Sequence, residues 1–71
     1  MKLFYDPDTD SLYIDFIARP GADAREIADG LVVDFDEEGR PVGIDIQHAS
    51  RNLDLSTLET QALPVPRTKL G

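Results

Sequence analysis

Hydrophobic and polar residues alternate along three stretches of the chain, which is the pattern of half-buried β-strands. The alternation predicts strands over residues 12–17, 31–36 and 42–47. A shorter strand over Lys2–Tyr5 precedes them, with Leu3 and Tyr5 facing inward. The inward-facing residues of the three longer strands are Leu12, Ile14, Phe16, Leu31, Val33, Phe35, Val42, Ile44 and Ile46.

Two turns separate these strands. Residues 7–10 (Pro-Asp-Thr-Asp) favour a tight reversal between the first two strands. Residues 37–40 join the later pair, and Gly39 can adopt the positive φ that such a hairpin needs. If Glu38-Gly39 is a two-residue loop, Phe35 faces Val42, Val33 faces Ile44 and Leu31 faces Ile46. A four-residue loop gives the same facing, whereas a one-residue slip places apolar against polar side chains.

The stretch from Arg19 to Gly30 has a weaker pattern. Pro20-Gly21 is a break, and Asp29-Gly30 is typical of a tight turn leading into the next strand. We therefore interpret residues 22–27 as a short edge strand. A helix over 22–28, with Gly30 at its C-cap, is the competing interpretation.

The period changes after Gln47. Ser56-Thr57-Leu58-Glu59 fits a capping box, which predicts a helix start. Ser50 is a second candidate start, for a turn through residues 51–54. The residues expected to lie on the sheet are Leu53, Leu55 and Leu58. We predict an α+β domain over residues 1–62, an antiparallel four- to five-stranded sheet ordered largely as a meander with a short C-terminal helix on one face. Pro64 and Pro66 end any helix, so residues 63–71 are predicted to be a mobile, Pro-containing tail.

A chain of 71 residues is near the lower limit for a self-sufficient core. It contains no cysteine, so neither a disulfide nor a thiolate metal site can supplement that core. Homo-oligomerisation is therefore the expected extra source of stability. No signal-peptide region and no apolar run of membrane-spanning length is present, so we expect a cytoplasmic protein without membrane contact.

Charge is distributed unevenly. The net charge is −7; residues 1–60 hold all fourteen acidic groups against five basic ones, and the last eleven residues hold two basic groups. Such a surface repels nucleic-acid phosphates, so direct DNA or RNA binding is not expected. A basic protein partner is electrostatically favoured. The alternative is that the acidity serves only solubility.

Two groups of acidic residues approach the spacing of a calcium loop. Asp6, Asp8 and Asp10 begin the pattern, but Ser11 and Ile17 occupy the places that require glycine and a carboxylate. The second group, which matches better, lies between strands rather than helices and is explained by a hairpin; its residues are Asp34, Asp36, Glu38, Gly39 and Asp45. No metal site and no cofactor is predicted.

The candidate binding residues lie on the sheet face opposite the core. They are Tyr13, Asp15, Asp34 and Asp45. An open sheet face suits partner binding better than catalysis, because it lacks the concavity that perturbs carboxylate pKa values. A divalent-metal-binding or hydrolytic protein using these carboxylates is the alternative; millimolar calcium, magnesium or manganese would then raise the thermal midpoint.

His48 is the single histidine and is assigned to the junction between sheet and helix. Ser50 lies two residues away, but no third member or oxyanion motif accompanies them. We therefore predict no catalytic residues and a non-enzymatic protein.

Several ordered motifs resemble those of the small bacterial proteins grouped as the domain-of-unknown-function family DUF2283. The resemblance covers residues 1 to about 50 and rests on residues 5–14 (YDPDTDSLYI), 26–36 (EIADGLVVDFD) and 39–46 (GRPVGIDI). It adds little about function, because the family has no agreed catalytic residues to carry over. Some members resemble antitoxin-side partners of small basic ribonuclease-like toxins, so the resemblance implies an antitoxin-like interaction module. The basic, Pro-containing end from Leu63 to Gly71 departs from the family pattern, and is either a partner-binding segment or a frayed end.

Overall fold

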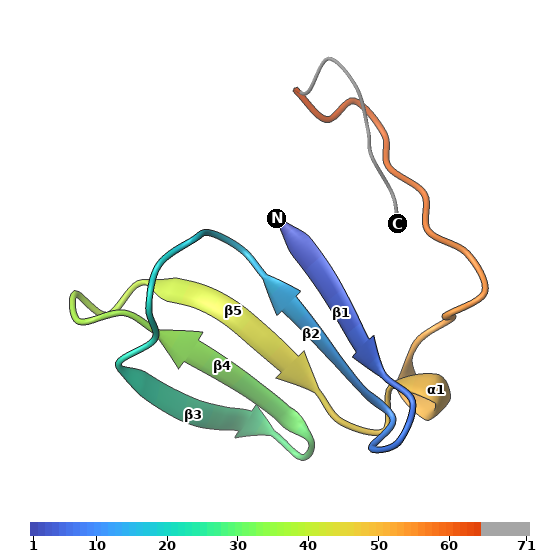
Figure 1. The fold of residues 1–71 in the computed structure, drawn as a ribbon, viewed down its shortest axis with the longest axis horizontal. Coiled ribbons are helices and arrows are strands. Elements are labelled where there is room, and N and C mark those ends of the chain that lie inside the picture. The colour runs from blue at the N-terminus through green and yellow to red at the C-terminus, as the bar shows by residue number, and fades with distance from the viewer. Residues whose placement is uncertain (65–71) are drawn as a thin grey trace.

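The computed structural model describes residues 1–64 and consists of one five-stranded antiparallel sheet followed by one short helix (Figure 1). The strands are β1 (Lys2–Asp6), β2 (Ser11–Asp15), β3 (Asp23–Ala28), β4 (Leu31–Phe35) and β5 (Pro41–Ile46), and the helix is α1 (Ala49–Asn52). The predicted fold class is confirmed.

The strand order in the sheet is β1-β2-β5-β4-β3. Three of the four pairings join strands that follow one another in the sequence, which is the meander part of the fold. The fourth pairs β2 with β5, and it places two antiparallel units side by side. The connection from β2 to β3 consequently runs along one end of the sheet, past β5 and β4 (Figure 1).

The β4–β5 hairpin confirms the predicted pairing of Leu31 with Ile46 and of Val33 with Ile44. The two-residue and four-residue loops that the sequence allowed are both wrong. The loop has three residues between Asp36 and Arg40, with Gly39 at φ +79°. A loop with an odd number of residues shifts the register by one. A β-bulge between Asp34 and Phe35 restores it, so Phe35 pairs with Pro41 instead of Val42.

The stretch that the sequence left ambiguous is the edge strand β3, and the competing helix does not form. The Asp29-Gly30 turn joins it directly to β4, with Gly30 at φ +75°. All six residues of β3 are exposed, as are all five of β1 at the other edge.

The two faces of the sheet differ in chemistry, because directly paired residues share a face. One face, called the apolar face below, collects Leu3, Tyr5, Leu12, Ile14, Leu31, Val33, Ile44 and Ile46. Of these only Leu12 and Val33 are buried, while Leu3 and Tyr5 are 46% and 45% exposed. No large side chain of the described residues is fully enclosed. The core is therefore shallow.

The helix differs from the prediction. It covers only Ala49–Asn52, and its N-cap is His48 in the left-handed conformation. The predicted capping box at residues 56–59 forms no helix. Instead, the Ser56 backbone N–H and hydroxyl both donate to the Asp54 carboxylate, which replaces the bond that the capping box requires.

Residues 53–64 continue without regular structure. Leu53, Leu55 and Leu58 border the β1–β2 half of the apolar face, as the sequence predicted, and enclose with it a groove of about 520 Å³. Leu55 and Leu58 remain 42% and 51% exposed. Of the predicted tail over 63–71, Leu63 and Pro64 lack regular structure and the rest lies outside the described residues. Within the described part of the chain, no helix has the length and apolar character needed to cross a membrane.

Candidate functional site

The four predicted binding residues come together on the face opposite the apolar face, called the acidic face below. Along one row of the sheet, Asp15 of β2 and Asp34 of β4 flank Gly43 of β5. Along the next row, Tyr13 and Val32 flank Asp45. Asp34 and Asp45 are diagonal neighbours, as the predicted register requires.

Tyr13 lies across the centre of this group. Its hydroxyl donates a 2.9 Å hydrogen bond to the Asp34 carboxylate, two strands away. The side chain reaches Asp34 by passing over Gly43, and a Cβ at that position would overlap the Tyr13 ring and hydroxyl. Glycine is therefore required in β5 for space, so that one aromatic side chain can span three strands.

The environment of Tyr13 raises its pKa to about 12. Burial is the largest cause, followed by the hydrogen bond to Asp34 and by the charges of Asp34, Asp15 and Asp45. Although Tyr13 lies on the face opposite the core, its side chain is partly buried, and so are the three carboxylates. The phenol is neutral at physiological pH and holds the Asp34 carboxylate by its hydrogen bond.

The acidic face has little positive charge of its own. Among the strand residues within residues 1–64, Lys2 is the one cation on this face, and it lies opposite Asp15 in the β1–β2 register. Glu26 of β3 adds a further carboxylate. Asp34 also borders a hollow of about 330 Å³, formed with residues 21–22 of the β2–β3 connection and residues 23–24 at the start of β3.

Metal binding finds no support in the side-chain positions. Among residues 1–64, no group of three or more His, Cys, Asp or Glu side chains is placed to hold a metal ion. The two calcium-like spacings are used for turns instead. Asp6 accepts the Asp8 backbone N–H, and Asp36 accepts those of Glu38 and Arg40.

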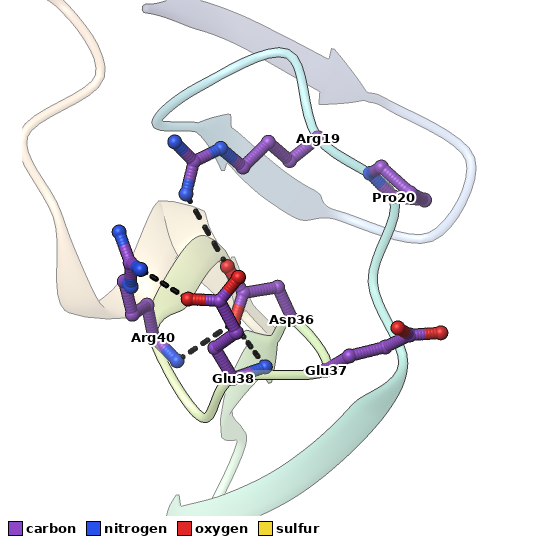
Figure 2. Close-up of a pocket in the computed structure, with 6 residues that line it drawn as sticks. All are labelled: Arg19, Pro20, Asp36, Glu37, Glu38 and Arg40. Carbon is purple, nitrogen blue, oxygen red and sulfur yellow. Dashed lines mark hydrogen bonds and ion pairs between the residues drawn. The ribbon is translucent and has the colours of Figure 1, made fainter.

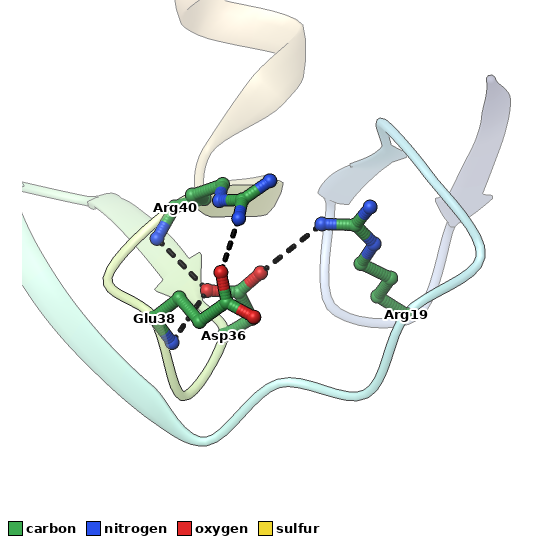
Figure 3. A network of polar contacts seen from close by, with 4 residues as sticks. All are labelled: Arg19, Asp36, Glu38 and Arg40. Carbon is green, nitrogen blue, oxygen red and sulfur yellow. Dashed lines mark hydrogen bonds and ion pairs between the residues drawn. The ribbon is translucent and has the colours of Figure 1, made fainter.

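Asp36 is also the centre of a second polar network, at the end of the sheet (Figure 2). Its carboxylate accepts two backbone N–H groups at 2.9 Å and pairs with the Arg19 guanidinium at 3.4 Å. These bonds lower the pKa of Asp36, and the Arg40 backbone N–H is the main cause. Figure 3 shows Arg40 paired with Glu38 beside it. The network borders a hollow of about 310 Å³ and ties the β2–β3 connection to the β4–β5 hairpin.

His48 lies at the predicted junction, and Ser50 takes part in a contact that the sequence did not reveal. The Asp10 carboxylate accepts the Ser50 backbone N–H and hydroxyl, the latter at 2.7 Å, and the Tyr5 hydroxyl at 2.7 Å. The Ser50 hydroxyl is the main cause of the lowered pKa of Asp10. The Ser50 hydroxyl is thus engaged by a carboxylate and not by His48, and the cluster fastens α1 to the β1–β2 turn.

Comparison with known families bears on the residues that build both faces. A family model described as "Protein of unknown function (DUF2283)" matches residues 2–50. The chain belongs to the DUF2283 family. The match covers all five strands and ends within α1, so the acidic face of this DUF2283 protein lies wholly inside the family region. Searches of curated proteins and of solved structures found no match.

Two residues of this DUF2283 protein matter more than the sequence suggested. Gly43 carries a signal in the sequence, because an isolated glycine inside an alternating strand indicates close approach by another group. Asp10 carries none, since its partner Ser50 is forty residues away. Its positive φ of 53° is visible only in the structure.

Proposed function

We propose that this DUF2283 protein is a non-enzymatic interaction module whose acidic face binds a small basic protein, in the manner of an antitoxin-like partner. The observation that carries the proposal is the arrangement of Asp15, Asp34 and Asp45 around the neutral phenol of Tyr13. Carboxylates held on a rigid sheet lose little conformational entropy when they bind a partner.

The same group offers a cation three kinds of contact. The carboxylates provide charge, the hollow beside Asp34 provides room for a side chain, and the Tyr13 ring provides an aromatic surface for a guanidinium or ammonium group. Partial burial of the carboxylates weakens their screening by salt and strengthens the attraction at short range. Lysine- or arginine-rich protein surfaces fit these features.

The proposal is tested by affinity capture of the tagged protein from its native cytosol at low and high salt, with mass spectrometry. A triple variant, Asp15→Asn with Asp34→Asn and Asp45→Asn, removes three charges from the acidic face. Asn at position 34 still accepts the Tyr13 hydroxyl hydrogen bond. We expect a stoichiometric basic protein with the wild type, and affinity reduced by roughly tenfold or more with the variant.

A matched control has the same net charge. Asp8→Asn with Glu37→Gln and Glu59→Gln removes three charges from exposed positions outside the acidic face. This control should keep the partner. If both triple variants lose the partner equally, the binding is unspecific charge attraction. If the wild type recovers no partner, the proposal loses its main support.

A further inference from the structure

The outer edge of β1 is an unprotected strand edge. β1 pairs with β2 on one side and, among residues 1–64, with no strand on the other (Figure 1). All five of its residues are exposed, and the central side chains of Leu3, Phe4 and Tyr5 are each more than two-fifths exposed. Such an edge presents backbone N–H and C=O groups to which a further strand can bond.

The opposite edge of the sheet, β3, has features that oppose pairing. Its register is irregular between Glu26 and Ala28. Its Arg25 is engaged within the chain, with Nε 3.8 Å from an Asp23 carboxylate oxygen and the guanidinium carbon 4.8 Å from the centre of the Phe35 ring. Bulges and charged side chains are devices by which sheet edges avoid association. β1 has a regular register with β2 and no charge among its three central residues.

The residues of β1 select the strand that fits this edge. In an antiparallel pairing of two copies centred on Phe4, Lys2 lies opposite Asp6 of the second copy. Leu3 then lies opposite Tyr5, so opposite charges end the pairing and apolar side chains fill its middle. A shift by two residues, the smallest that keeps each face continuous, removes the pairing of Lys2 with Asp6. A parallel arrangement in register places like charges side by side. The centred antiparallel register is therefore the one that matches charge with charge.

We propose that β1 is the interface of a symmetric homodimer, in which two sheets join edge to edge into one continuous antiparallel sheet. The pairing is isologous, because residue 2 meets residue 6 at both ends of it. Lys2 forms no ion pair with another residue of the described chain, so it is available to Asp6 of the second copy. Since directly paired residues share a face, both acidic faces lie on the same side of the joined sheet. The dimer does not depend on the binding of a basic protein.

Sedimentation equilibrium and amide exchange test the dimer without any other protein present. A five-residue pairing is a small interface, so association is expected at roughly micromolar to millimolar protein, where the mass should rise toward twice 7.9 kDa. Over the same range, the β1 amides that are not bonded to β2 should become protected from exchange. A chain that stays monomeric at millimolar concentration overturns the proposal. A dimer whose β1 amides stay unprotected overturns it as well.

Two charge-reversal variants test the register. In Lys2→Glu, like charges face each other at both ends of the pairing, and the same is true of Asp6→Lys. Each variant alone should dimerise at least about tenfold more weakly than the wild type, because two repulsive pairs replace two attractive ones. An equimolar mixture of the two variants should restore the dimer, since each end of the mixed pairing again joins opposite charges. Circular dichroism shows whether each variant is folded.

Matched controls make the same charge changes outside β1. Arg51→Glu on α1 and Glu37→Lys in the β4–β5 hairpin alter exposed positions, and both should dimerise nearly as the wild type does. Asp6 also accepts the Asp8 backbone N–H, so if Asp6→Lys fails to fold, the comparison of Lys2→Glu with Arg51→Glu decides alone. Equal association of these two variants, or a mixture that fails to recover, contradicts the proposed pairing.

Discussion

Gly43 and Tyr13 form the contact on which the acidic face depends. The tyrosine crosses the sheet only because β5 has no side chain beneath it. The two residues are thirty positions apart in the sequence and belong to strands that pair in the sheet.

Gly43→Ala should destabilise the protein by about 1–3 kcal/mol, because the added methyl group overlaps Tyr13 and must displace it. Chemical denaturation measures the change. In a Tyr13→Ala background the same substitution should cost much less, since the overlapping side chain is gone. An equal cost in both backgrounds would show that the alanine acts through the backbone of β5 instead.

The raised pKa of Tyr13 makes stability depend on alkaline pH. The folded-state pKa of about 12 exceeds the usual value of 10, so the protonated phenol favours the folded state. This contribution is complete below pH 10 and is lost as the pH rises through 12. We expect a loss on the order of 1 kcal/mol, since solvent reduces the full effect of a two-unit shift.

Ultraviolet titration of the phenolate measures this pKa directly, with Tyr13→Phe identifying the signal. Asp34→Asn should lower the Tyr13 pKa toward 10, because it removes the nearest negative charge. Asp8→Asn, on the exposed β1–β2 turn, is the control and should leave it unchanged. A Tyr13 pKa near 10 in the wild type would contradict the burial described here.

Among the secondary-structure elements, α1 depends on a residue outside it. Asp10 adopts a positive φ in the β1–β2 turn and binds Ser50 inside the helix. Asp10→Ala should lower the Tm and speed amide exchange in α1, because it removes the acceptor and strains the backbone. Asp10→Asn keeps an acceptor and tolerates this conformation, so it should have a smaller effect.

Acid should weaken the same contact. The pKa of Asp10 is lowered in the folded state, so its stabilising contribution is complete above the ordinary carboxyl pKa and is lost as the pH falls through the folded value. Amide exchange in α1 followed by NMR from neutral to acid pH measures the release. If α1 exchanges equally in both variants at all pH values, Asp10 does not hold it.

How far the sequence predicted these elements depends on the range of the interactions. Alternation predicts β2, β4 and β5 and both faces, because side-chain parity is local. The weaker pattern at β3 is interpreted as a strand only from the Asp29-Gly30 turn that follows it. The β2–β5 pairing was not foreseen, since nothing in either strand excludes β3 as the neighbour of β2. Of the two candidate helix starts, Ser50 lies within α1, two residues after the observed N-cap His48. Ser56 begins no helix, because the capping-box pattern ignores Asp54, which competes for the same serine.

For the candidate site, strand parity brought together Tyr13, Asp15, Asp34 and Asp45, and the register confirms their shared face. Parity does not give the reach of a side chain. The partial burial of Tyr13 and its bond to Asp34 therefore required coordinates, as did the hollow formed by the β2–β3 connection.

For the whole molecule, net charge is the dominant electrostatic property. The fourteen acidic groups outnumber the seven basic ones, so the acidic groups repel one another within a small volume. Moderate sodium chloride should therefore raise the Tm at neutral pH, since it screens this repulsion more than it weakens the few exposed ion pairs. Differential scanning calorimetry measures the shift. Near the isoelectric point of about 4.3 the same salt should have little effect on the Tm. A Tm that falls with salt at neutral pH would show that the ion pairs contribute more to stability than the repulsion costs.

The position of β5 between β2 and β4 has a consequence for the order in which the chain folds. The β1–β2 hairpin is complete by Asp15, yet its partner strand begins only at Pro41. During synthesis one edge of this hairpin therefore stays unpaired until β5 has been made. We expect β3, β4 and β5 to assemble first and the β2–β5 seam to close last, because closing the longest loop costs the most chain entropy. In pulse-labelled hydrogen exchange during refolding, amides bonded between β4 and β5 should then become protected before those bonded between β2 and β5.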